Sequence, residues 1–288
     1  MGLWFTEEAS PHHLLQWKVS RLLFSGQSPY QTVEVVDTEQ FGPSLVLDGI
    51  MQTTQGDEYV YHEMLAWVPL AVHPHPERVL IIGGGDGGLA REVLASPAVK
   101  EVTMVEIDAM VIDAAKQFLG SHTAAFSDPR LQIITADGME YLSDVENFFD
   151  LVLVDSTDPE GSGPGNVLYT EAFHQRVHKA LKADGLFIQQ SGSPIYNPEV
   201  LQAISADIAH QFPICRVYWC VVPTYPGGLF TFTSGSKQYD LLNFTPLEVP
   251  HARWYTPDIH RGAFALPPVV SQYVPASVRT GQSTLSQG

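Results

Sequence analysis

Residues 78–93 read RVLIIGGGDGGLAREV, an apolar run followed by a glycine-rich loop with one aspartate and then an amphipathic segment. Gly83, Gly85 and Gly88 have G-x-G-x-x-G spacing, which lets a ligand approach the backbone between a strand and the following helix. A tight turn alone would not need five glycines around one aspartate. The stretch therefore predicts a nucleotide-like ligand at the end of a buried strand in an α/β sheet.

Strand and helix patterns alternate after this loop. Apolar runs at 101–107, 130–136 and 149–155 are separated by segments whose apolar residues recur at helical spacing. Continuously apolar strands that alternate with helices predict a mostly parallel sheet covered on both faces, a doubly wound Rossmann-like α/β fold. Residues 214–222 and 228–235 follow each other without a helix between them, which predicts an antiparallel hairpin at the sheet edge.

The patterns divide the chain into three parts. Residues 1–55 carry short alternating stretches from Leu14 on, broken by Gly and Pro turns, and predict a small antiparallel β domain. Residues 56–276 form the predicted Rossmann-like catalytic domain, which begins with a helix at 57–72. Residues 277–288 are polar and featureless, so we expect a flexible tail.

The composition restricts the partners and the compartment. Thirty-two acidic against 15 basic residues give a formal charge of −17, which disfavours nucleic acid and anionic membranes and favours cationic partners. The sequence shows no signal peptide and no apolar run of about 18 residues, so we expect a cytoplasmic protein. Cys215 and Cys220 are expected to be unpaired core residues on opposite sides of one extended segment. His73 and His75 are flanked by prolines, and we expect them in a solvated linker.

Acidic residues follow successive strands of the predicted sheet. Asp86 lies inside the glycine loop and would repel a pyrophosphate at the helix N-terminus, so the ligand should be cationic at this point. Glu106 ends the second strand, where doubly wound folds place a carboxylate on ribose hydroxyls. Asp137 and Gly138 follow the third strand, where a carboxylate could accept a hydrogen bond from an adenine amino group. These positions suit an adenosyl sulfonium better than a dinucleotide.

Two more carboxylates follow the fourth strand, in LVLVDSTDP. The end of this strand lines the same crevice in a doubly wound sheet, so Asp155 and Asp158 would face the molecule that reacts with the sulfonium. The same residues could instead cap a turn or a helix. A metal site is a third alternative, but no His or Cys lies nearby in the sequence and oxygen-only sites usually use more carboxylates. No metal is therefore predicted.

Several motifs, taken in order, resemble the spermidine synthases of the polyamine aminopropyltransferase family. They are VLIIGGGDGG, MVEIDAMVI, DGMEYL, LVDSTDP, VPTYPGG and WYTPDIHRGAFALP. The resemblance implies a Rossmann-like fold of the methyltransferase type and a homodimer or homotetramer. It also implies aminopropyl transfer from decarboxylated S-adenosylmethionine to putrescine, which gives spermidine and methylthioadenosine without a tightly bound cofactor.

The resemblance also implies residue roles, with Asp155 as the base that deprotonates the attacking amine. The residues that would hold the donor are Gln31, His62, Gly83, Gly85, Asp86, Gly88, Glu106, Asp137 and Gly138. Those that would line the putrescine site are Tyr61, Asp86, Asp155, Asp158 and Tyr225. The charges agree, because decarboxylation leaves the donor chain ending in an ammonium that Asp86 can pair with. An amine with a pKa of about 10 arrives protonated and needs a base before it can attack carbon.

Two departures from the family pattern affect the acceptor side. The loop DPEGSGPGNVLYTEAF is longer than the usual D-P-x-G-P form, and QQSGSP replaces Q-x-E. They leave open whether putrescine, cadaverine, agmatine or a longer amine is used. We also expect residues 156–170 to close over the ligands as a lid, since long Gly- and Pro-containing loops beside a site often do so.

The sequence leaves three alternatives to aminopropyl transfer. A small-amine N-methyltransferase would use S-adenosylmethionine, whose carboxylate Asp86 would repel. A non-catalytic polyamine or nucleoside binder would not need the set of Asp86, Asp155 and Asp158. The glycine spacing alone would also be compatible with a nicotinamide-dependent dehydrogenase.

Overall fold

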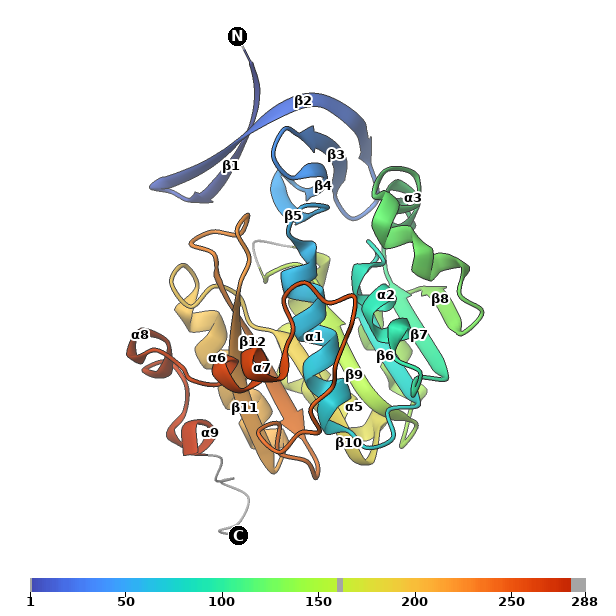
Figure 1. Ribbon diagram of the computed structural model, residues 1–288, viewed down its shortest axis with the longest axis vertical. Coiled ribbons are helices and arrows are strands. Elements are labelled where there is room, and N and C mark those ends of the chain that lie inside the picture. The colour runs from blue at the N-terminus through green and yellow to red at the C-terminus, as the bar shows by residue number, and fades with distance from the viewer. Residues whose placement is uncertain (1, 160–162, 281–288) are drawn as a thin grey trace.

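The computed structural model describes residues 2–159 and 163–280. Helix α1 (Glu58–Val72) joins an N-terminal antiparallel sheet to a larger, mostly parallel sheet (Figure 1). The N-terminal strands pair in the order in which they occur along the chain. They are β1 (Leu3–Ser10), β2 (His13–Gln27), β3 (Thr32–Thr38), β4 (Gly42–Leu47) and β5 (Ile50–Thr54).

Strand β1 was not predicted, because only one of its eight residues is buried and its sequence shows no clear apolar alternation. The inner strands behave as expected. Val33 and Val35 of β3 pack with Val111 and Ala115 of helix α3 (Ala109–Phe118), which belongs to the second domain. This packing holds the N-terminal sheet over one end of the parallel strands (Figure 1).

The larger sheet has the strand order β11-β12-β10-β9-β6-β7-β8. Five neighbouring strands from β10 to β8 are parallel, and β12 and β11 complete the sheet as the predicted antiparallel edge hairpin. The chain runs outward from β6 through β7 to β8 and then returns to β9 on the other side of β6. Such a reversal opens a crevice at the carboxyl ends of β6 and β9. The strands are β6 (Arg78–Gly83), β7 (Glu101–Glu106), β8 (Leu131–Thr135), β9 (Phe149–Asp155), β10 (Leu181–Gln190), β11 (Ile214–Val221) and β12 (Leu229–Ser236).

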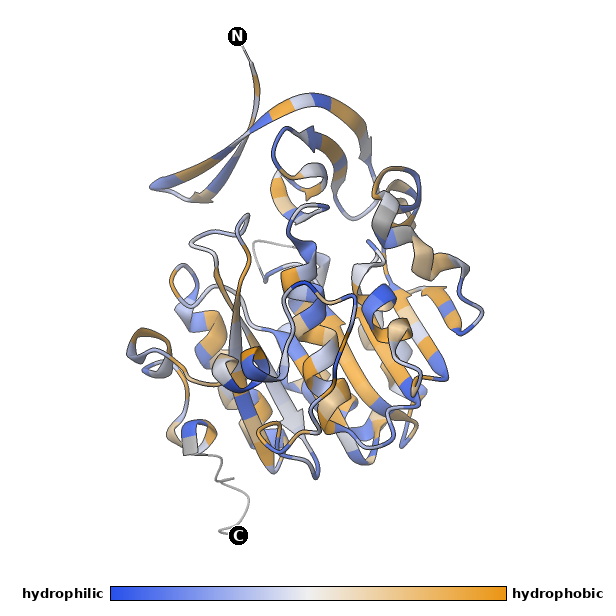
Figure 2. Ribbon diagram, in the orientation of Figure 1, coloured by the Kyte–Doolittle hydropathy of each residue, from blue (hydrophilic) through white to orange (hydrophobic). Residues whose placement is uncertain are grey.

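Both faces of this sheet are covered, which explains its continuously apolar strands (Figure 2). In β9, Leu151 and Leu153 pack on the side of α1, whereas Val152 and Val154 pack against the opposite layer with Phe173 of α5. The remaining helices are α2 (Gly88–Ala95), α4 (Gly138–Tyr141), α5 (Glu171–Ala180), α6 (Pro198–Gln211), α7 (Pro257–Ala263), α8 (Pro268–Ser271) and α9 (Ala276–Thr280). Short 3₁₀ segments are η1 (Gly120–Ser127), η2 (Leu142–Asp144) and η3 (Pro164–Tyr169).

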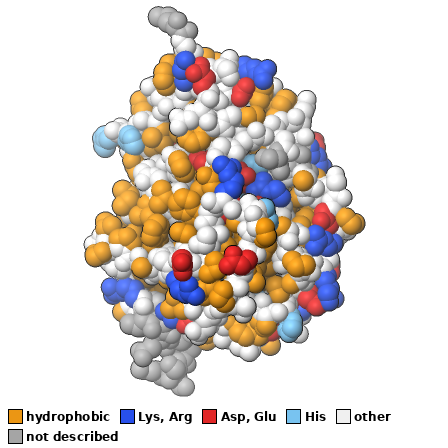
Figure 3. Space-filling model, in the orientation of Figure 1, with side chains coloured by type: hydrophobic (Ala, Val, Ile, Leu, Met, Phe, Trp, Pro, Cys, Tyr) orange, Lys and Arg blue, Asp and Glu red, His pale blue; other side chains and the backbone are white. Residues whose placement is uncertain are grey.

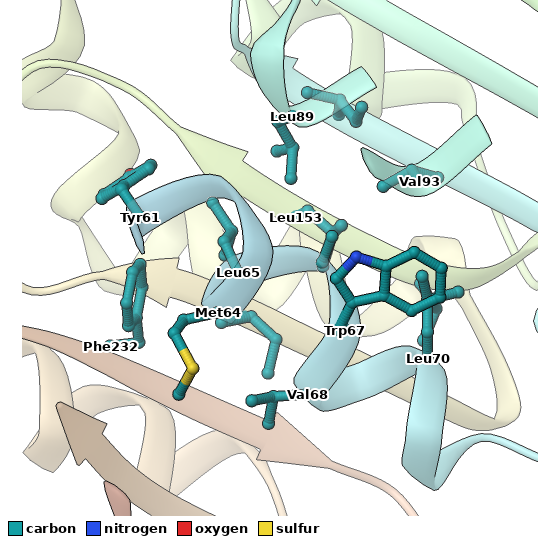
Figure 4. Close-up of a cluster of buried hydrophobic side chains, with 14 of the residues drawn as sticks. Tyr61, Met64, Leu65, Trp67, Val68, Leu70, Leu89, Val93, Leu153 and Phe232 are labelled. Carbon is teal, nitrogen blue, oxygen red and sulfur yellow. The ribbon is translucent and has the colours of Figure 1, made fainter. Parts of the chain in front are cut away.

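Helix α1 is buried on every side, not on one face only. Every residue from Val60 to Val72 is buried, and Figure 4 shows Met64, Leu65 and Trp67 among the side chains of neighbouring elements. The segment before α7 closes the remaining side, where the Glu63 carboxylate accepts hydrogen bonds from three successive backbone N–H groups at 253–255. This burial fixes the side chains that α1 presents to the crevice.

Two sequence expectations are wrong. His73 is only 3% exposed, because its ring packs against Tyr239 and faces Asp184, whereas His75 is exposed as expected. The tail begins later than predicted, because Ala276–Thr280 is helical and Val278 is buried, while residues 281–288 lie outside the described residues.

The cysteine prediction is confirmed. Cys215 and Cys220 are free and buried, and they belong to the core clusters on opposite faces of the sheet. In the described part of the chain, the helices are too short or too polar to cross a lipid bilayer.

Candidate active site

A cavity of about 520 Å³ opens at the carboxyl ends of the parallel strands, beneath the N-terminal sheet. It brings together all but one of the predicted site residues. Those that line it are Gln31, Tyr61, His62, Gly83, Gly85, Asp86, Glu106, Asp137, Gly138, Asp155, Asp158 and Tyr225. Gly88 is the exception, since it lies behind the wall and donates its backbone N–H to Asp86 Oδ1 at 2.6 Å.

The glycine loop fits closely against strand β9 and helix α1. Gly83 has φ +81°, and a Cβ at this position would collide with the carbonyl oxygen of Asp155. The next residue, Gly84, donates its N–H to that oxygen at 2.8 Å. A Cβ on Gly88 would collide with the ring of His62. Gly83 and Gly88 are therefore required by the close approach of the protein's own groups.

One part of the cavity wall presents polar groups suited to a nucleoside. Glu106 is buried, and its carboxylate accepts a hydrogen bond from the N–H of Asp108 at 2.9 Å. Gln31 reaches from the N-terminal domain and donates to Asp108 Oδ2 at 3.0 Å. Asp137 caps α4 by accepting from the N–H groups of Met139 and Glu140, both through Oδ1. Asp137 thus caps a helix and also lies on the cavity wall.

Burial raises the pKa of Glu106 to about 7, and the charge of Asp108 adds to this shift. The folded protein therefore binds this proton more tightly than the unfolded chain, and the associated stability is lost as pH rises through about 7. We expect Glu106→Gln to stabilise the ligand-free protein more at pH 8 than at pH 5, by about 2 to 3 kcal/mol. Urea denaturation at the two pH values measures this difference, and equal effects at both would contradict the raised pKa.

Asp86 belongs to a buried charged group behind the glycine loop. His62 Nδ1 lies 2.5 Å from Glu58 Oε2, and His62 Nε2 lies 3.6 Å from Asp86 Oδ2 and 3.8 Å from Asp155 Oδ2. Burial disfavours charge on His62, but Asp86 and Glu58 outweigh it and raise the pKa of His62 well above its usual value. Despite burial, the nearby imidazoles hold the pKa of Asp86 well below its usual range. At neutral pH, His62 is therefore a cation between carboxylates.

Asp155 ends strand β9 directly beside Gly83 of β6. Its Oδ2 atom is buried and has no hydrogen-bond partner among residues 2–159 and 163–280. Burial raises the pKa of Asp155 to about 6, with Asp86 adding to the shift and His62 opposing it. Such a carboxylate is mostly ionised at neutral pH and basic enough to take up a proton. Asp155 therefore has the position and basicity of a general base.

Asp158 and its neighbours in the loop are held by Gln190, the last residue of β10, and by Tyr169 of η3. Gln190, at the end of β10, donates through Nε2 to Asp158 Oδ1 at 2.7 Å and to the carbonyl of Ser156 at 3.0 Å. The Tyr169 hydroxyl donates to the carbonyl of Thr157 at 2.9 Å. These contacts tie the described part of the 156–170 loop to the strand ends. Residues 160–162 lie outside the described residues, so closure of the loop as a lid stays a prediction.

Aromatic rings form another part of the wall. The ring centroids of Tyr61 and Tyr225 are 6.1 Å apart, and Phe230 lies 4.9 Å from Tyr225. The Tyr225 hydroxyl donates to the carbonyl of Gln52 in β5 at 2.7 Å. The N-terminal domain thus positions a ring that can contact an aliphatic chain or a cationic group.

The sequence did not reveal several residues around the site. Of these, only Glu58 has a local signal, its i, i+4 spacing from the predicted residue His62 on one helix face. The others come from distant segments that no local pattern connects. They are Glu7 and Glu8 of β1, which line the cavity, and Arg91, His122, Tyr169 and Gln190, which contact the acidic residues or their loop.

The negative charge inside the cavity favours an organic cation. His62, Asp86 and Asp155 offer ligand atoms within 4.8 Å of one another, a spacing that could also hold a metal ion. A protonated imidazole has no free lone pair for a metal, so the raised pKa of His62 disfavours that alternative. On the outer face shown in Figure 3, charged side chains of both signs are scattered in small groups.

Two domain families match this chain. The spermine/spermidine synthase domain matches residues 58–245, and the spermidine synthase tetramerisation domain matches residues 3–55. The chain belongs to the spermine/spermidine synthase family. A polyamine aminopropyltransferase of Desulforudis audaxviator is 46% identical over 93% of this chain and 97% of that protein. One of Bacillus subtilis is 44% identical over 94% of this chain and 99% of its own length.

Solved spermidine synthases share the fold. A spermidine synthase in complex with the transition-state analogue AdoDATO has a TM-score of 0.91 and 40% identity, with 94% of both chains covered. The spermidine synthase of Thermotoga maritima has a TM-score of 0.89 and 39% identity over the same shares. The chain is thus a polyamine aminopropyltransferase of the spermidine-synthesising class, on a Rossmann-like fold of the methyltransferase type, as its motifs predicted.

Proposed function

We propose that this aminopropyltransferase uses decarboxylated S-adenosylmethionine as donor and putrescine as acceptor, with Asp155 as general base. The observation that carries the proposal is the buried Oδ2 of Asp155, which has no hydrogen-bond partner in the described part of the chain and lies in a cavity that also holds Asp86 and Asp158. Asp155 would lie between the donor at Asp86 and the acceptor at Asp158. This position suits a base for transfer between two positively charged substrates.

The donor is proposed to lie along the ends of β6, β7 and β8. Glu106 would accept hydrogen bonds from ribose hydroxyls, and Asp137 and Gly138 would lie at the adenine. Asp86 would pair with the ammonium at the end of the aminopropyl chain, whereas the carboxylate of S-adenosylmethionine would be repelled there. A related spermidine synthase of the same fold forms a complex with the transition-state analogue AdoDATO, which supports a donor of this class.

The proposed step needs one proton transfer and one substitution. Asp155 takes a proton from one ammonium group of putrescine, which frees a nitrogen lone pair. The nitrogen attacks the aminopropyl carbon bonded to sulfur, a C–N bond forms, and the C–S electron pair returns to sulfur. The products are spermidine and uncharged methylthioadenosine, and the proton on Asp155 passes to solvent.

The acceptor is proposed to lie between the aromatic wall and Asp158. Tyr61 and Tyr225 would contact its methylene chain, and Asp158, held by Gln190, would attract an ammonium group. The test is to incubate the purified protein with decarboxylated S-adenosylmethionine and putrescine, cadaverine, agmatine or spermidine, and to identify products by mass spectrometry. Spermidine and methylthioadenosine in equal amounts are expected, and transfer only to another amine would overturn the choice of putrescine.

We also propose a homo-oligomer formed through β1 and β2, which lie within the matched tetramerisation domain. Four large apolar side chains on these strands are more than half exposed in the isolated chain: Leu3, Trp4, Leu14 and Leu22. Such an apolar surface is typical of an interface. Trp4→Asp is expected to lower the particle mass measured by light scattering, because it places a charge in that interface. Leu242→Asp, at an exposed apolar position elsewhere, is the control. A monomeric wild type, or an unchanged mass for Trp4→Asp, would contradict the proposal.

A further inference from the structure

His122 is a buried histidine to which the proposed reaction gives no role. It lies in η1 and is 0% exposed. Its Nδ1 atom lies 3.6 Å from Asp86 Oδ1, and its Nε2 atom lies 3.6 Å from Glu58 Oε1. Neither ring nitrogen has a hydrogen-bond partner within the described ranges 2–159 and 163–280. The imidazole therefore spans the space between two buried carboxylates.

The charged side chains that face His122 are those around Asp86. Glu58 and His62 face it from α1, and the His62 and His122 rings are edge to face with centroids 5.9 Å apart. Arg91 of α2 binds the other oxygen of Glu58 at 2.9 Å. The glycine loop packs directly on η1, since a Cβ on Gly87 would lie 3.0 Å from the carbonyl oxygen of His122. A movement of His122 would therefore change the position of the Asp86 carboxylate.

Asp86 is contacted at both oxygens before a ligand arrives. Oδ1 accepts from the Gly88 N–H at 2.6 Å and faces His122, while Oδ2 faces His62 at 3.6 Å. A shift of about 0.5 Å would bring His122 Nδ1 within hydrogen-bond distance of Oδ1. A carboxylate held in this way loses less freedom when it binds an ammonium group. A buried imidazole whose two nitrogens form no hydrogen bond with any described residue also calls for an explanation.

We propose that His122 is a positioning residue, which holds the Asp86 carboxylate in place for the ammonium end of the donor through its Nδ1 atom. It thereby contributes to the preference of the pocket for a cationic aminopropyl chain. This inference rests on the proposed donor. It assigns to His122 an effect on one end of the donor only, because the nucleoside contacts of Glu106 and Asp137 lie at other strand ends.

Three substitutions at position 122 distinguish the contributions of the two ring nitrogens. In His122→Asn the side-chain amide lies near the place of Nδ1, in His122→Gln it lies nearer that of Nε2, and His122→Leu has no donor. We expect Leu and Gln to weaken binding of decarboxylated S-adenosylmethionine by about 10-fold, the loss of one charge-assisted contact. Asn should remain within about 3-fold of wild type. Binding of methylthioadenosine, which lacks the ammonium, should not change in any of them.

The readouts are calorimetric dissociation constants for both ligands, together with KM for the donor and kcat. The ratio of the two dissociation constants does not depend on the fraction of folded protein, so a destabilised variant still tests the inference. KM should rise in the Leu and Gln variants while kcat changes little. His73→Leu is the matched control, because His73 is also buried and its Nε2 has no hydrogen-bond partner among the described residues, but its ring faces Asp184 and Tyr239 instead of Asp86.

Two failures can be distinguished. If the Asn, Gln and Leu variants lose affinity equally for both ligands, His122 only supports the packing of η1 and the inference is overturned. The same holds if Asp86→Asn lowers the preference for the decarboxylated donor but the His122 variants do not. If Asp86→Asn leaves that preference unchanged, the proposed pairing of Asp86 with the ammonium fails, and the role of His122 fails with it.

Discussion

Asp155→Asn is expected to lower kcat by about 100-fold to 10,000-fold, the usual cost of losing a general base. Asn has nearly the same shape as Asp but cannot accept a proton from the attacking ammonium. The glycine loop and Glu106 are untouched, so binding of methylthioadenosine should stay close to wild type. Single-turnover product formation and calorimetry measure the two effects separately.

The control for this substitution is Asp150→Asn, at the opposite end of the same strand. Asp150 is also buried, but it accepts hydrogen bonds from Lys182 and from the N–H groups of Glu77 and Arg78. Its loss should lower stability without changing the kcat of the folded enzyme. Near-normal turnover in Asp155→Asn would remove Asp155 from the role of base.

The pH dependence follows from the same residue. Because the ionised form of Asp155 is required, kcat/KM of the wild type should fall as pH drops through about 6. His62 keeps its charge across this range, since its pKa is raised well above its usual value. An acidic limb that remains unchanged in Asp155→Asn would have to come from another group.

Asp86→Asn is expected to weaken binding of decarboxylated S-adenosylmethionine by about 10-fold to 100-fold, because a hydrogen bond between charged partners is lost. Methylthioadenosine carries no ammonium, so its affinity should change by less than about 3-fold. S-adenosylmethionine should bind better to the variant than to wild type, since the repulsion of its carboxylate is relieved.

Calorimetry with the three ligands tests this selectivity directly. Equal losses for the decarboxylated donor and methylthioadenosine would mean that Asp86 only shapes the glycine loop, through its bond to Gly88. Asp158→Asn serves as a comparison on the acceptor side, where we expect KM for putrescine to rise and donor affinity to persist. Loss of donor affinity in that variant would place Asp158 differently from the proposal.

The sequence by itself determined the layout of the sheet and the strand-end positions of the acidic residues. Strands that are apolar on both faces can be recognised locally, because each of their residues faces a covered layer, as Leu151 and Val152 do. The glycine spacing at Gly83 was also local, since it reflects backbone conformation. Strand β1 and helix α9 escaped notice because β1 shows no clear apolar alternation and α9 has only five residues.

Only the tertiary structure decided which groups hold the acidic residues in place and shift their pKa values. His62 and Asp86 are far apart in the chain, and the raised pKa of His62 depends on Asp86 and on Glu58, which no strand-end rule would include. The sequence did not show that His73 and His122 are buried, since their burial depends on segments that pack from elsewhere in the fold. The raised pKa of Asp155 is the clearest case. Hydrophobic periodicity is a property of neighbouring residues, whereas desolvation and Coulomb interaction are set by whatever the folded chain brings near.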